Sequence, residues 1–255
     1  MFRSLLMQKQ RQQSNDLAEV YAYADSIGVT PQQVDAALAD KPAIIREKLI
    51  AWKYLIHSLI NTGYTPWLKG DGVAYIETDI TPVSSSYVDI HFTIETGGAF
   101  ICGARGTSSQ RYVIYVANRY VRNDWASGAQ NNYPTRFAAG TPIQVYEVAG
   151  YGAVDGVEYT FDNVSRSAYG DPLLIYTIYD KGSVRTEKYA GKISSVKFSG
   201  LRDSVAVTGH FVPYLDNGSY GMLDLVTGTF YGSAVPNGLF AYILEDSNGN
   251  TVNLN

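Results

Sequence analysis

The sequence predicts a mainly β protein in which an antiparallel sandwich or barrel follows a short helical segment. Its 21 tyrosines and 24 glycines in 255 residues favour many short strands joined by tight turns. The apolar residues change from a helical period to a period of two near Gly63. Strand-like runs then recur at a spacing of roughly 8–12 residues, which is typical of a sandwich or barrel. Strands and helices do not alternate, so a parallel α/β fold is not expected.

The first 63 residues are predicted to form a helical segment with an anchoring or oligomerisation role, and residues 67–255 are predicted to form the sandwich. Thr30-Pro31-Gln32-Gln33 has the pattern of a capping box that starts a short helix. A longer helix is expected from Ala43 to Asn61, ended by Thr62-Gly63. It carries apolar residues spaced 4, 3, 4 and 3 apart, like a heptad seam: Ile45, Leu49, Trp52, Ile56 and Leu59. This seam is interpreted either as internal core or as an oligomer or docking seam.

The predicted strands alternate apolar and polar residues between Gly, Pro, Asn and Asp. The run 143–148 is expected to pair with the run 157–161, and Asp180-Lys181-Gly182 is expected to be a turn. Asn217-Gly218 and Thr227-Gly228 predict turns around a hairpin of residues 220–226 and 229–231. The strands are predicted over residues 73–78, 87–94, 100–104, 111–116, 120–122, 143–148, 157–161, 173–179, 191–198 and 205–213.

Composition and charge disfavour several classes of function. The formal net charge is -4 and no Lys/Arg stripe is present, so we expect no nucleic-acid partner. Cys102 is the only cysteine, which excludes an intrachain disulfide and a cysteine-based zinc site. No secretory signal and no apolar run of membrane-spanning length is visible, so we expect cytoplasmic folding and no membrane span. We expect neither a cofactor nor a metal.

Several stretches resemble concanavalin A-like, LamG-type jelly-roll proteins found in the tails and virions of phages of gut bacteria. The opening strand of that family resembles residues 68–80, although Asp79 stands where the family commonly has Gly. Residues 100–105, 191–193 and 211–214 are similar to later landmark strands, and Gly221 to Gly232 is similar to a closing "Gly-x-x-Asp" and "Phe-Tyr" phrase. The start, Met1 to Met7, also looks like the start of such phage proteins. The resemblance covers about residues 67–242 and leaves out the helical segment.

This resemblance implies a jelly-roll sandwich and a non-enzymatic structural protein of the bacteriophage virion, in the tail or a head fibre. It would assemble in the host cytoplasm as a homo-oligomer with other virion proteins, and its sandwich would project outward, where host surface glycans are a further partner. The alternative is a carbohydrate-binding adhesin module outside any virion.

A glycoside hydrolase is the enzyme alternative, because some of these enzymes share the jelly-roll fold. Retaining glycosidases need two carboxylates about 5 Å apart. Glu77-Thr78-Asp79 begins a suitable Glu-x-Asp-x-x-Glu pattern, but Pro82 occupies its last position. The three histidines, His57, His91 and His210, have no metal-ligand spacing. No enzyme activity is therefore predicted.

The loop 123–134 has the composition of a sugar site, with aromatic residues beside Asn, Asp and Gly. An ordinary long loop, with its tryptophan packed on the rim of the sandwich, is the alternative interpretation. Calcium has only scattered candidate ligands in Asp71, Asp155, Asp162 and Asp171. The predicted ligand-binding residues are Asn123, Asp124, Trp125, Asn131, Asn132 and Tyr133.

Overall fold

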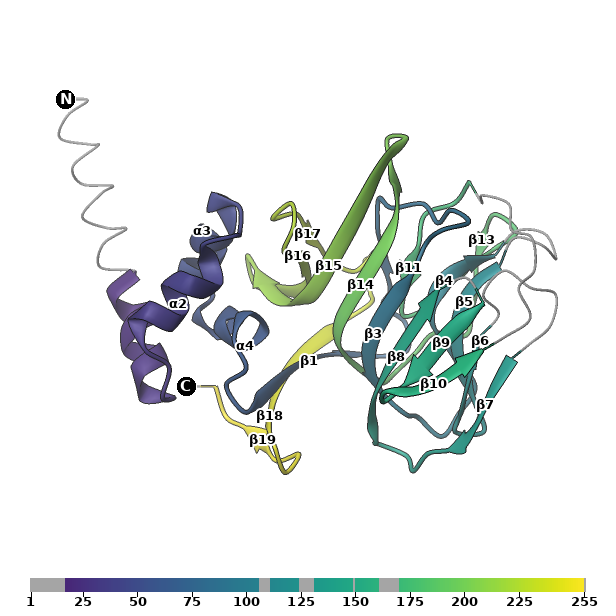
Figure 1. The fold of residues 1–255 in the computed structure, drawn as a ribbon, viewed down its shortest axis with the longest axis horizontal. Coiled ribbons are helices and arrows are strands. Elements are labelled where there is room, and N and C mark those ends of the chain that lie inside the picture. Colours follow the sequence, from purple (N-terminus) through teal and green to yellow (C-terminus); the bar gives the residue numbers. More distant parts are fainter. Residues whose placement is uncertain (1–16, 106–110, 124–130, 149, 161–169, 255) are drawn as a thin grey trace. The chain divides into compact units, whose positions relative to one another are not determined.

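The structure is a computed structural model, and it describes residues 17–105, 111–123, 131–148, 150–160 and 170–254. The chain divides into two compact units (Figure 1). The helical unit comprises residues 1–66, 225–228 and 244–255, and the sandwich unit comprises residues 67–224 and 229–243. The helical segment thus shares its unit with two later pieces of chain. In the described part of the chain, no helix has the length and apolar character needed to cross a membrane.

The helical unit begins with a helix over residues 17–26, followed by α2 (Pro31–Leu38). The predicted capping box of α2 is confirmed, because the Thr30 side chain accepts a hydrogen bond from the Gln33 backbone and the Gln33 side chain accepts one from the Thr30 backbone. The other elements of this unit are α3 (Ala43–Ala51), the 3-10 turn η1 (Lys53–Leu55) and α4 (Ile56–Leu59), and the unit also holds β19 (Thr251–Val252).

The single helix expected from Ala43 to Asn61 is wrong. Trp52 has an extended backbone, with φ of -142° and ψ of 87°, and separates α3 from η1 and α4. All four residues 54–57 are buried. One straight helix cannot direct four consecutive side chains into one core, because its residues are spread around the axis at 3.6 per turn. The break at Trp52 therefore separates the buried residues Ile45 and Leu49 of α3 from the buried run 54–57 of η1 and α4.

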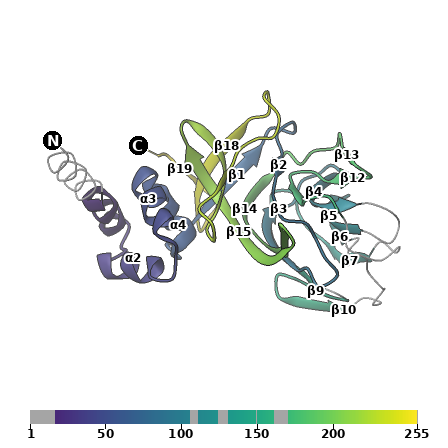
Figure 2. The same cartoon turned by 90° about the horizontal axis from the view of Figure 1, so that it is seen from above.

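The sandwich is built from two sheets, seen as two layers in Figures 1 and 2, and all of its strands except β19 lie wholly or partly in the sandwich unit. Sheet A has the order β10-β9-β8-β3-β14-β1-β18-β19, and a hairpin series β15-β16-β17 continues from β14. Its strands are β1 (Tyr64–Gly70), β3 (Val88–Thr93), β8 (Pro142–Val148), β9 (Tyr151–Val154), β10 (Val157–Thr160), β14 (Lys192–Arg202), β15 (Val205–Asp216), β16 (Ser219–Asp224), β17 (Phe230–Tyr231) and β18 (Phe240–Asp246).

Sheet B has the order β13-β12-β4-β5-β6-β7, and β11 pairs with both β2 and β4. The β12–β4 pair is parallel, whereas the other strand pairs described here are antiparallel. The strands of sheet B are β2 (Ile76–Glu77), β4 (Ala99–Arg105), β5 (Arg111–Ala117), β6 (Tyr120–Asn123), β7 (Asn131–Arg136), β11 (Leu174–Ile175), β12 (Tyr179–Asp180) and β13 (Ser183–Val184).

Three predicted turns are confirmed. Asn217 and Gly218 have positive φ angles of 48° and 81° between β15 and β16, as a two-residue hairpin turn requires. Lys181 and Gly182 likewise join β12 to β13. The predicted hairpin near residue 228 is also present, because Met222 pairs with Tyr231 in β16 and β17.

Three predicted pairings or strands are wrong. The strand predicted over residues 73–78 is reduced to the two-residue β2 (Ile76–Glu77). β8 pairs with β9, and β10 pairs with β9 instead of with β8. The strand predicted over residues 173–179 is broken at Tyr176, which has a φ of 74° and a fully buried ring. The Tyr176 hydroxyl donates a hydrogen bond to the Leu68 carbonyl. The interruption of the strand thus gives this buried hydroxyl a hydrogen-bond acceptor on the backbone.

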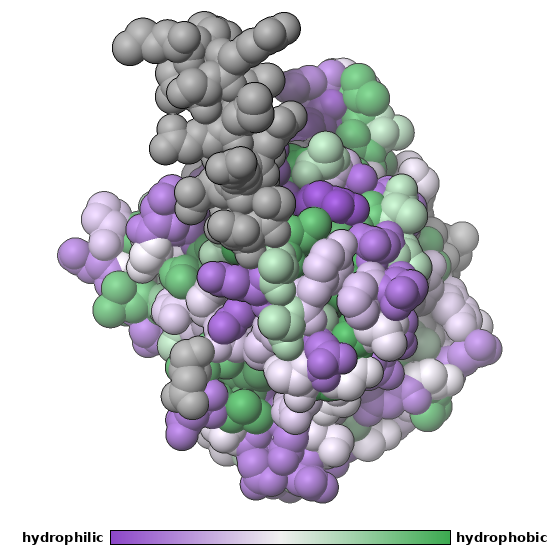
Figure 3. Space-filling view, turned by 90° about the vertical axis from the view of Figure 1, so that its left-hand side faces the viewer, coloured by the Kyte–Doolittle hydropathy of each residue, from purple (hydrophilic) through white to green (hydrophobic). Residues whose placement is uncertain are grey.

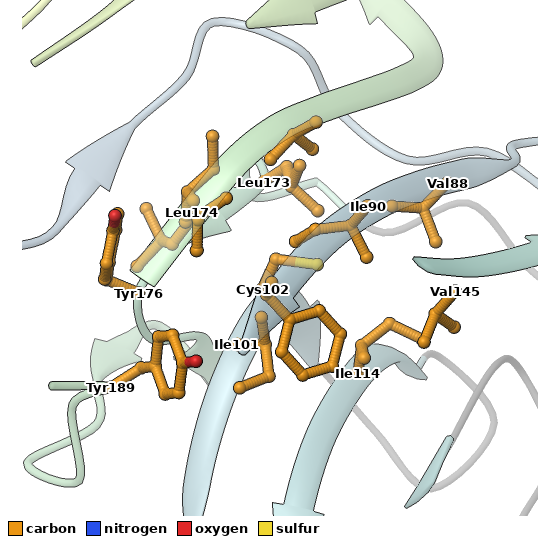
Figure 4. Packing of buried hydrophobic residues seen from close by; sticks show 14 of the residues in the cluster. Val88, Ile90, Ile101, Cys102, Ile114, Val145, Leu173, Leu174, Tyr176 and Tyr189 are labelled. Atoms are coloured by element: carbon orange, nitrogen blue, oxygen red, sulfur yellow. The ribbon is translucent and has the colours of Figure 1, made fainter. Parts of the chain in front are cut away.

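The core lies between the two sheets. Figure 4 shows Val88, Ile90 and Val145 of sheet A directed toward Cys102 and Ile114 of sheet B. All five side chains are fully buried. The apolar half of each alternating strand therefore closes the sandwich, and the other half is left for the outer faces of the sheets.

Candidate functional site

The outer face of sheet A carries the polar half of β3 and β8. In β3, Val88, Ile90 and Phe92 are buried, whereas the alternate residues Asp89 and His91 are partly exposed. β8 alternates in the same way, with Gln144 exposed and Tyr146 partly exposed. The register pairs Asp89 directly with Tyr146, so these two side chains lie on the same face.

Three tyrosines form a row across this face, which we call the tyrosine row: Tyr87, Tyr146 and Tyr151. The ring centroids of Tyr87 and Tyr146 are 6.0 Å apart, and those of Tyr146 and Tyr151 are 6.2 Å apart. All three side chains are partly exposed. Within the described part of the chain, neither the Tyr87 nor the Tyr146 hydroxyl has a hydrogen-bond partner. A hydrogen bond to Glu158, with a smaller contribution from burial, raises the pKa of Tyr151.

Polar groups surround the tyrosine row in fixed positions. The Gln144 side-chain amide donates to Asp89 Oδ1 at 2.7 Å, and Lys197 Nζ lies 3.9 Å from Asp89 Oδ2. His91 Nδ1 lies 2.5 Å from Ser194 Oγ. Burial lowers the pKa of His91, and Asp155 and Asp89 oppose that shift only in part. The imidazole is therefore neutral at pH 7 and serves as a hydrogen-bonding group.

A cavity of about 350 Å³ opens on the same face. Ser199 and Thr208 face each other across β14 and β15, and both line it. Ser199 Oγ accepts a hydrogen bond of 2.9 Å from the Tyr87 backbone amide, which fixes the cavity beside the tyrosine row. No charged residue lines the cavity among the residues that the structure describes; its lining also includes Val83, Ser85, Leu201 and Ala206.

The arrangement suits a ligand with hydroxyl groups and apolar faces. Aromatic rings can stack on the C–H faces of such a ligand, and amides, hydroxyls and a carboxylate fix its hydroxyls. Tyr146 and Tyr151 lie on the paired strands β8 and β9, and Tyr87 immediately precedes β3, which pairs with β8. Strand pairing therefore sets the spacing of the three rings. In the sequence, this face is indicated by the polar or aromatic residues that alternate with buried apolar ones in the runs 87–91 and 144–146.

The loop predicted to bind sugars is placed differently. Asn123 ends β6 and pairs with Asn131 at the start of β7, and Asn132 pairs with Arg122, so these asparagines belong to strands. Asp124 and Trp125 lie outside the described residues. The prediction that Tyr133 binds a ligand is corrected by the structure, because the Tyr133 ring is fully buried and its hydroxyl donates a hydrogen bond to Glu147 in the core. That ring is unavailable for stacking on a ligand at the surface.

The predicted docking seam is mostly internal. Ile45, Leu49 and Ile56 are fully buried within the single chain, and only Trp52 and Leu59 are partly exposed. The break at Trp52 also means that the five residues do not share one helical face. The structure thus corrects the docking interpretation for the three buried side chains and agrees with the core interpretation. Oligomerisation stays a prediction.

The carboxylates of the hydrolase hypothesis border a separate cavity of about 530 Å³. Asp79 accepts a hydrogen bond of 2.7 Å from Arg202 Nη2, and its other carboxylate oxygen lies 2.7 Å from Arg202 Nε in the same ion pair. Glu77 accepts a hydrogen bond of 3.0 Å from the Tyr179 hydroxyl. Burial alone would raise the pKa of Asp79, but Arg202 outweighs burial and the pKa lies below its usual range. A carboxylate so held is a poor proton donor.

The candidate calcium ligands that the structure describes do not form a metal-binding cluster. Asp71 accepts hydrogen bonds from three backbone amides, those of Val73, Ala74 and Leu239, each at 2.7 Å. Asp155 accepts from the Gln144 backbone amide, and Asp162 lies outside the described residues. Among the described residues, no group of three or more His, Cys, Asp or Glu side chains is arranged to hold a metal ion.

Comparison with known proteins supports the fold. No family model and no curated protein matches the sequence. The structure is similar to a protein from Bacteroides ovatus that is provisionally described as carbohydrate-binding, with a TM-score of 0.50 and 13% identity over 75% of this chain. The match covers 62% of that protein, which is less than two thirds of its length. A heptameric SAP-like pentraxin from Limulus polyphemus also matches, with a TM-score of 0.42 and 18% identity over 52% of this chain and 75% of that one. The predicted fold class, a mainly β concanavalin A-like sandwich after short N-terminal helices, is confirmed.

Proposed function

We propose that the sandwich unit binds an uncharged glycan on the outer face of sheet A. The observation that carries this proposal is the tyrosine row beside a cavity lined by hydroxyl groups. A row of partly exposed tyrosine rings is unusual for a surface that contacts only water, because a ligand laid over the rings would bury further apolar ring area. The structural similarity to a protein provisionally described as carbohydrate-binding supports the same function.

The charge of the face favours a neutral sugar. Asp89, Asp155 and Glu158 are acidic, His91 is neutral at pH 7, and Lys197 is the nearest cation to Asp89. Lys197 and Asp89 offset one another, and among the described residues no ion pair joins Asp155 or Glu158 to a cation. Lys192 is a further cation near this face, and its ammonium lies over the Trp67 ring beside His91. A sugar acid would be repelled, whereas neutral hydroxyls can donate to the carboxylates.

We also propose binding without turnover. Asp79, which the hydrolase hypothesis needs, is engaged by Arg202, and Glu77 by Tyr179. The test is to incubate the protein with every glycan that it binds and to look for shortened products by mass spectrometry. Products that persist in Tyr146→Ala but vanish in Glu77→Gln would contradict the proposal.

Binding is tested on a glycan array, followed by titration calorimetry with the best ligand. We expect Tyr146→Ala to weaken binding about tenfold or more, which corresponds to about 1.4 kcal/mol of lost stacking. Tyr115→Ala is the matched control, since Tyr115 is a partly exposed tyrosine in β5 of the other sheet, packed against Phe100. Equal affinity of Tyr146→Ala and wild type, or a preference for acidic glycans, would overturn the proposal.

The virion setting is a separate proposal. Placement in a phage particle, other virion proteins as partners and homo-oligomer formation rest on the sequence resemblance alone. A glycan-binding face is compatible with that setting and with an adhesin outside any virion. Immunogold labelling of phage particles with an antibody to this chain distinguishes the two, because only a virion component would label intact particles.

A further inference from the structure

A second cavity, of about 310 Å³, lies wholly within the helical unit. Its volume is at the lower end of the range for small-molecule pockets, roughly 300–1,000 Å³. One side is aromatic, formed by Tyr23, Tyr54, His57 and Tyr64, and the other is aliphatic. The remaining lining residues are Ile27, Lys53, Leu244, Val252, Asn253 and Leu254.

The aromatic side is held in place by edge-to-face packing and hydrogen bonds. The Tyr23 and Tyr54 rings meet edge to face at 5.1 Å, and His57 lies 5.8 Å from Tyr23 and 5.4 Å from Tyr64. His57 Nε2 lies 2.7 Å from the Tyr23 hydroxyl, and His57 Nδ1 lies 2.6 Å from the Thr62 hydroxyl. Burial lowers the pKa of His57 to about 4, so the ring is neutral at pH 7. It therefore shapes the cavity without adding charge.

Among the lining residues that the structure describes, Lys53 is the charged one. Its ammonium lies 5.2 Å from the Tyr23 ring centroid and 5.4 Å from that of Tyr54. Among the described residues, no carboxylate pairs with Lys53, and no acidic residue lines the cavity. The two rings position the ammonium but cannot neutralise it, since a cation–π contact leaves the charge in place. The cavity thus combines one fixed positive charge with apolar walls.

We propose that this cavity binds a small organic acid with an apolar or aromatic body. Its carboxylate would pair with the Lys53 ammonium, and its body would lie between the tyrosine rings and the aliphatic side chains of Ile27, Leu244 and Val252. A carboxylate that meets a lysine in a partly desolvated pocket gains more than it would in open solvent. The site is independent of the glycan-binding face, because none of its residues belongs to the sandwich unit.

The test uses 4-phenylbutyrate and its neutral amide, 4-phenylbutanamide, in NMR titrations of the full chain. We expect saturable binding of the acid, at least tenfold tighter than that of the amide, with shifts of the Tyr54 and His57 amides. Lys53→Gln should remove the preference for the acid. Arg46→Gln is the matched control, because Arg46 is an exposed cation on α3 in the same unit and does not line the cavity.

Equal binding of acid and amide by the wild-type protein would overturn the proposal, and so would the lack of saturable binding of either compound at millimolar concentration. This comparison needs no variant, so a failure of Lys53→Gln to fold would not obscure it. An acid preference that survives in folded Lys53→Gln would also contradict the assignment of the charge to Lys53.

Discussion

Arg202 at the end of β14 joins three parts of the sandwich unit and supports the cavity beside the tyrosine row. Its Nε and Nη2 contact the two carboxylate oxygens of Asp79 at 2.7 Å, and Nη2 lies 3.3 Å from Asp224 Oδ2. The Asp224 side chain is fully buried, that of Arg202 is 18% exposed, and that of Asp79 is 47% exposed. Leu201, the neighbour of Arg202, lines the cavity and pairs with Thr81 through two backbone hydrogen bonds of 2.8 Å.

Replacing Arg202 with methionine should cost about 2–3 kcal/mol of the free energy of unfolding. Breaking a fully buried ion pair costs roughly 3–5 kcal/mol, because the remaining charge stays desolvated. Here the cost is lower, since Asp224 keeps a 3.0 Å hydrogen bond from the His210 amide and Arg202 has some access to solvent. Asp79→Asn should cost at most about 1 kcal/mol, because half-exposed ion pairs contribute little.

The assay is equilibrium unfolding in urea followed by circular dichroism, with Asp79→Asn as the matched comparison. The informative quantity is the ratio of the losses in unfolding free energy caused by the two substitutions, because that ratio depends on which carboxylate is buried. A cost below about 1 kcal/mol for Arg202→Met, or a cost no larger than that of Asp79→Asn, would refute the reasoning that Asp224 is the partner that matters.

Two further substitutions test the backbone of the sandwich unit. Gly103→Ala should lower the free energy of unfolding by about 3 kcal/mol or more, because Gly103 has a φ of +147° and a Cβ there would lie 2.1 Å from the Tyr112 carbonyl oxygen. Thermal unfolding measures this loss of stability. The control is Gly97→Ala, which should be nearly neutral because a Cβ at Gly97 meets open space. Asp71→Asn should destabilise the protein most at pH 7, and the effect should shrink as the pH falls below about 4. Burial alone would raise the pKa of Asp71, but three backbone donors outweigh burial and lower it. The stabilisation is therefore fully present above the unfolded-state pKa of about 4 and is lost as the pH falls through the lower native pKa. A constant difference in melting temperature between wild type and Asp71→Asn from pH 7 to pH 3 would contradict this.

Local sequence patterns, namely apolar–polar alternation and turn residues, predicted much of the sandwich. The alternating runs gave β3, β5 and β8 to within one residue of their observed bounds, because one face of each strand packs in the core. They also gave the starts of β14 and β15, which extend to Arg202 and Asp216, beyond the predicted ends at residues 198 and 213. The turn at Asn217-Gly218 was predictable for a local reason as well, since both residues tolerate a positive φ.

Features that depend on strand pairing could not be predicted. β8 was assigned to the wrong partner because β9 is only four residues long and includes Gly152, so it lacks a strong strand pattern. Tyr133 was expected at the surface because its neighbours are polar. Its pairing in β7 directs the ring inward to Glu147.

The candidate site was missed for the same reason. Tyr87, Tyr146 and Tyr151 are separated by up to 64 residues and become neighbours only through the register of β3, β8 and β9. Alternation does show that the first two point outward from their strands. It cannot show that their rings lie 6.0 Å apart.

Amide shift mapping with a bound neutral oligosaccharide is the most direct test of glycan binding by the outer face of sheet A. The labelled protein is titrated with the strongest ligand from the array. We predict that the largest shift changes fall on Tyr87, Gln144, Tyr146, Tyr151 and Ser199. Changes concentrated in residues 124–130 or in the helical unit, with these five unchanged, would contradict the account.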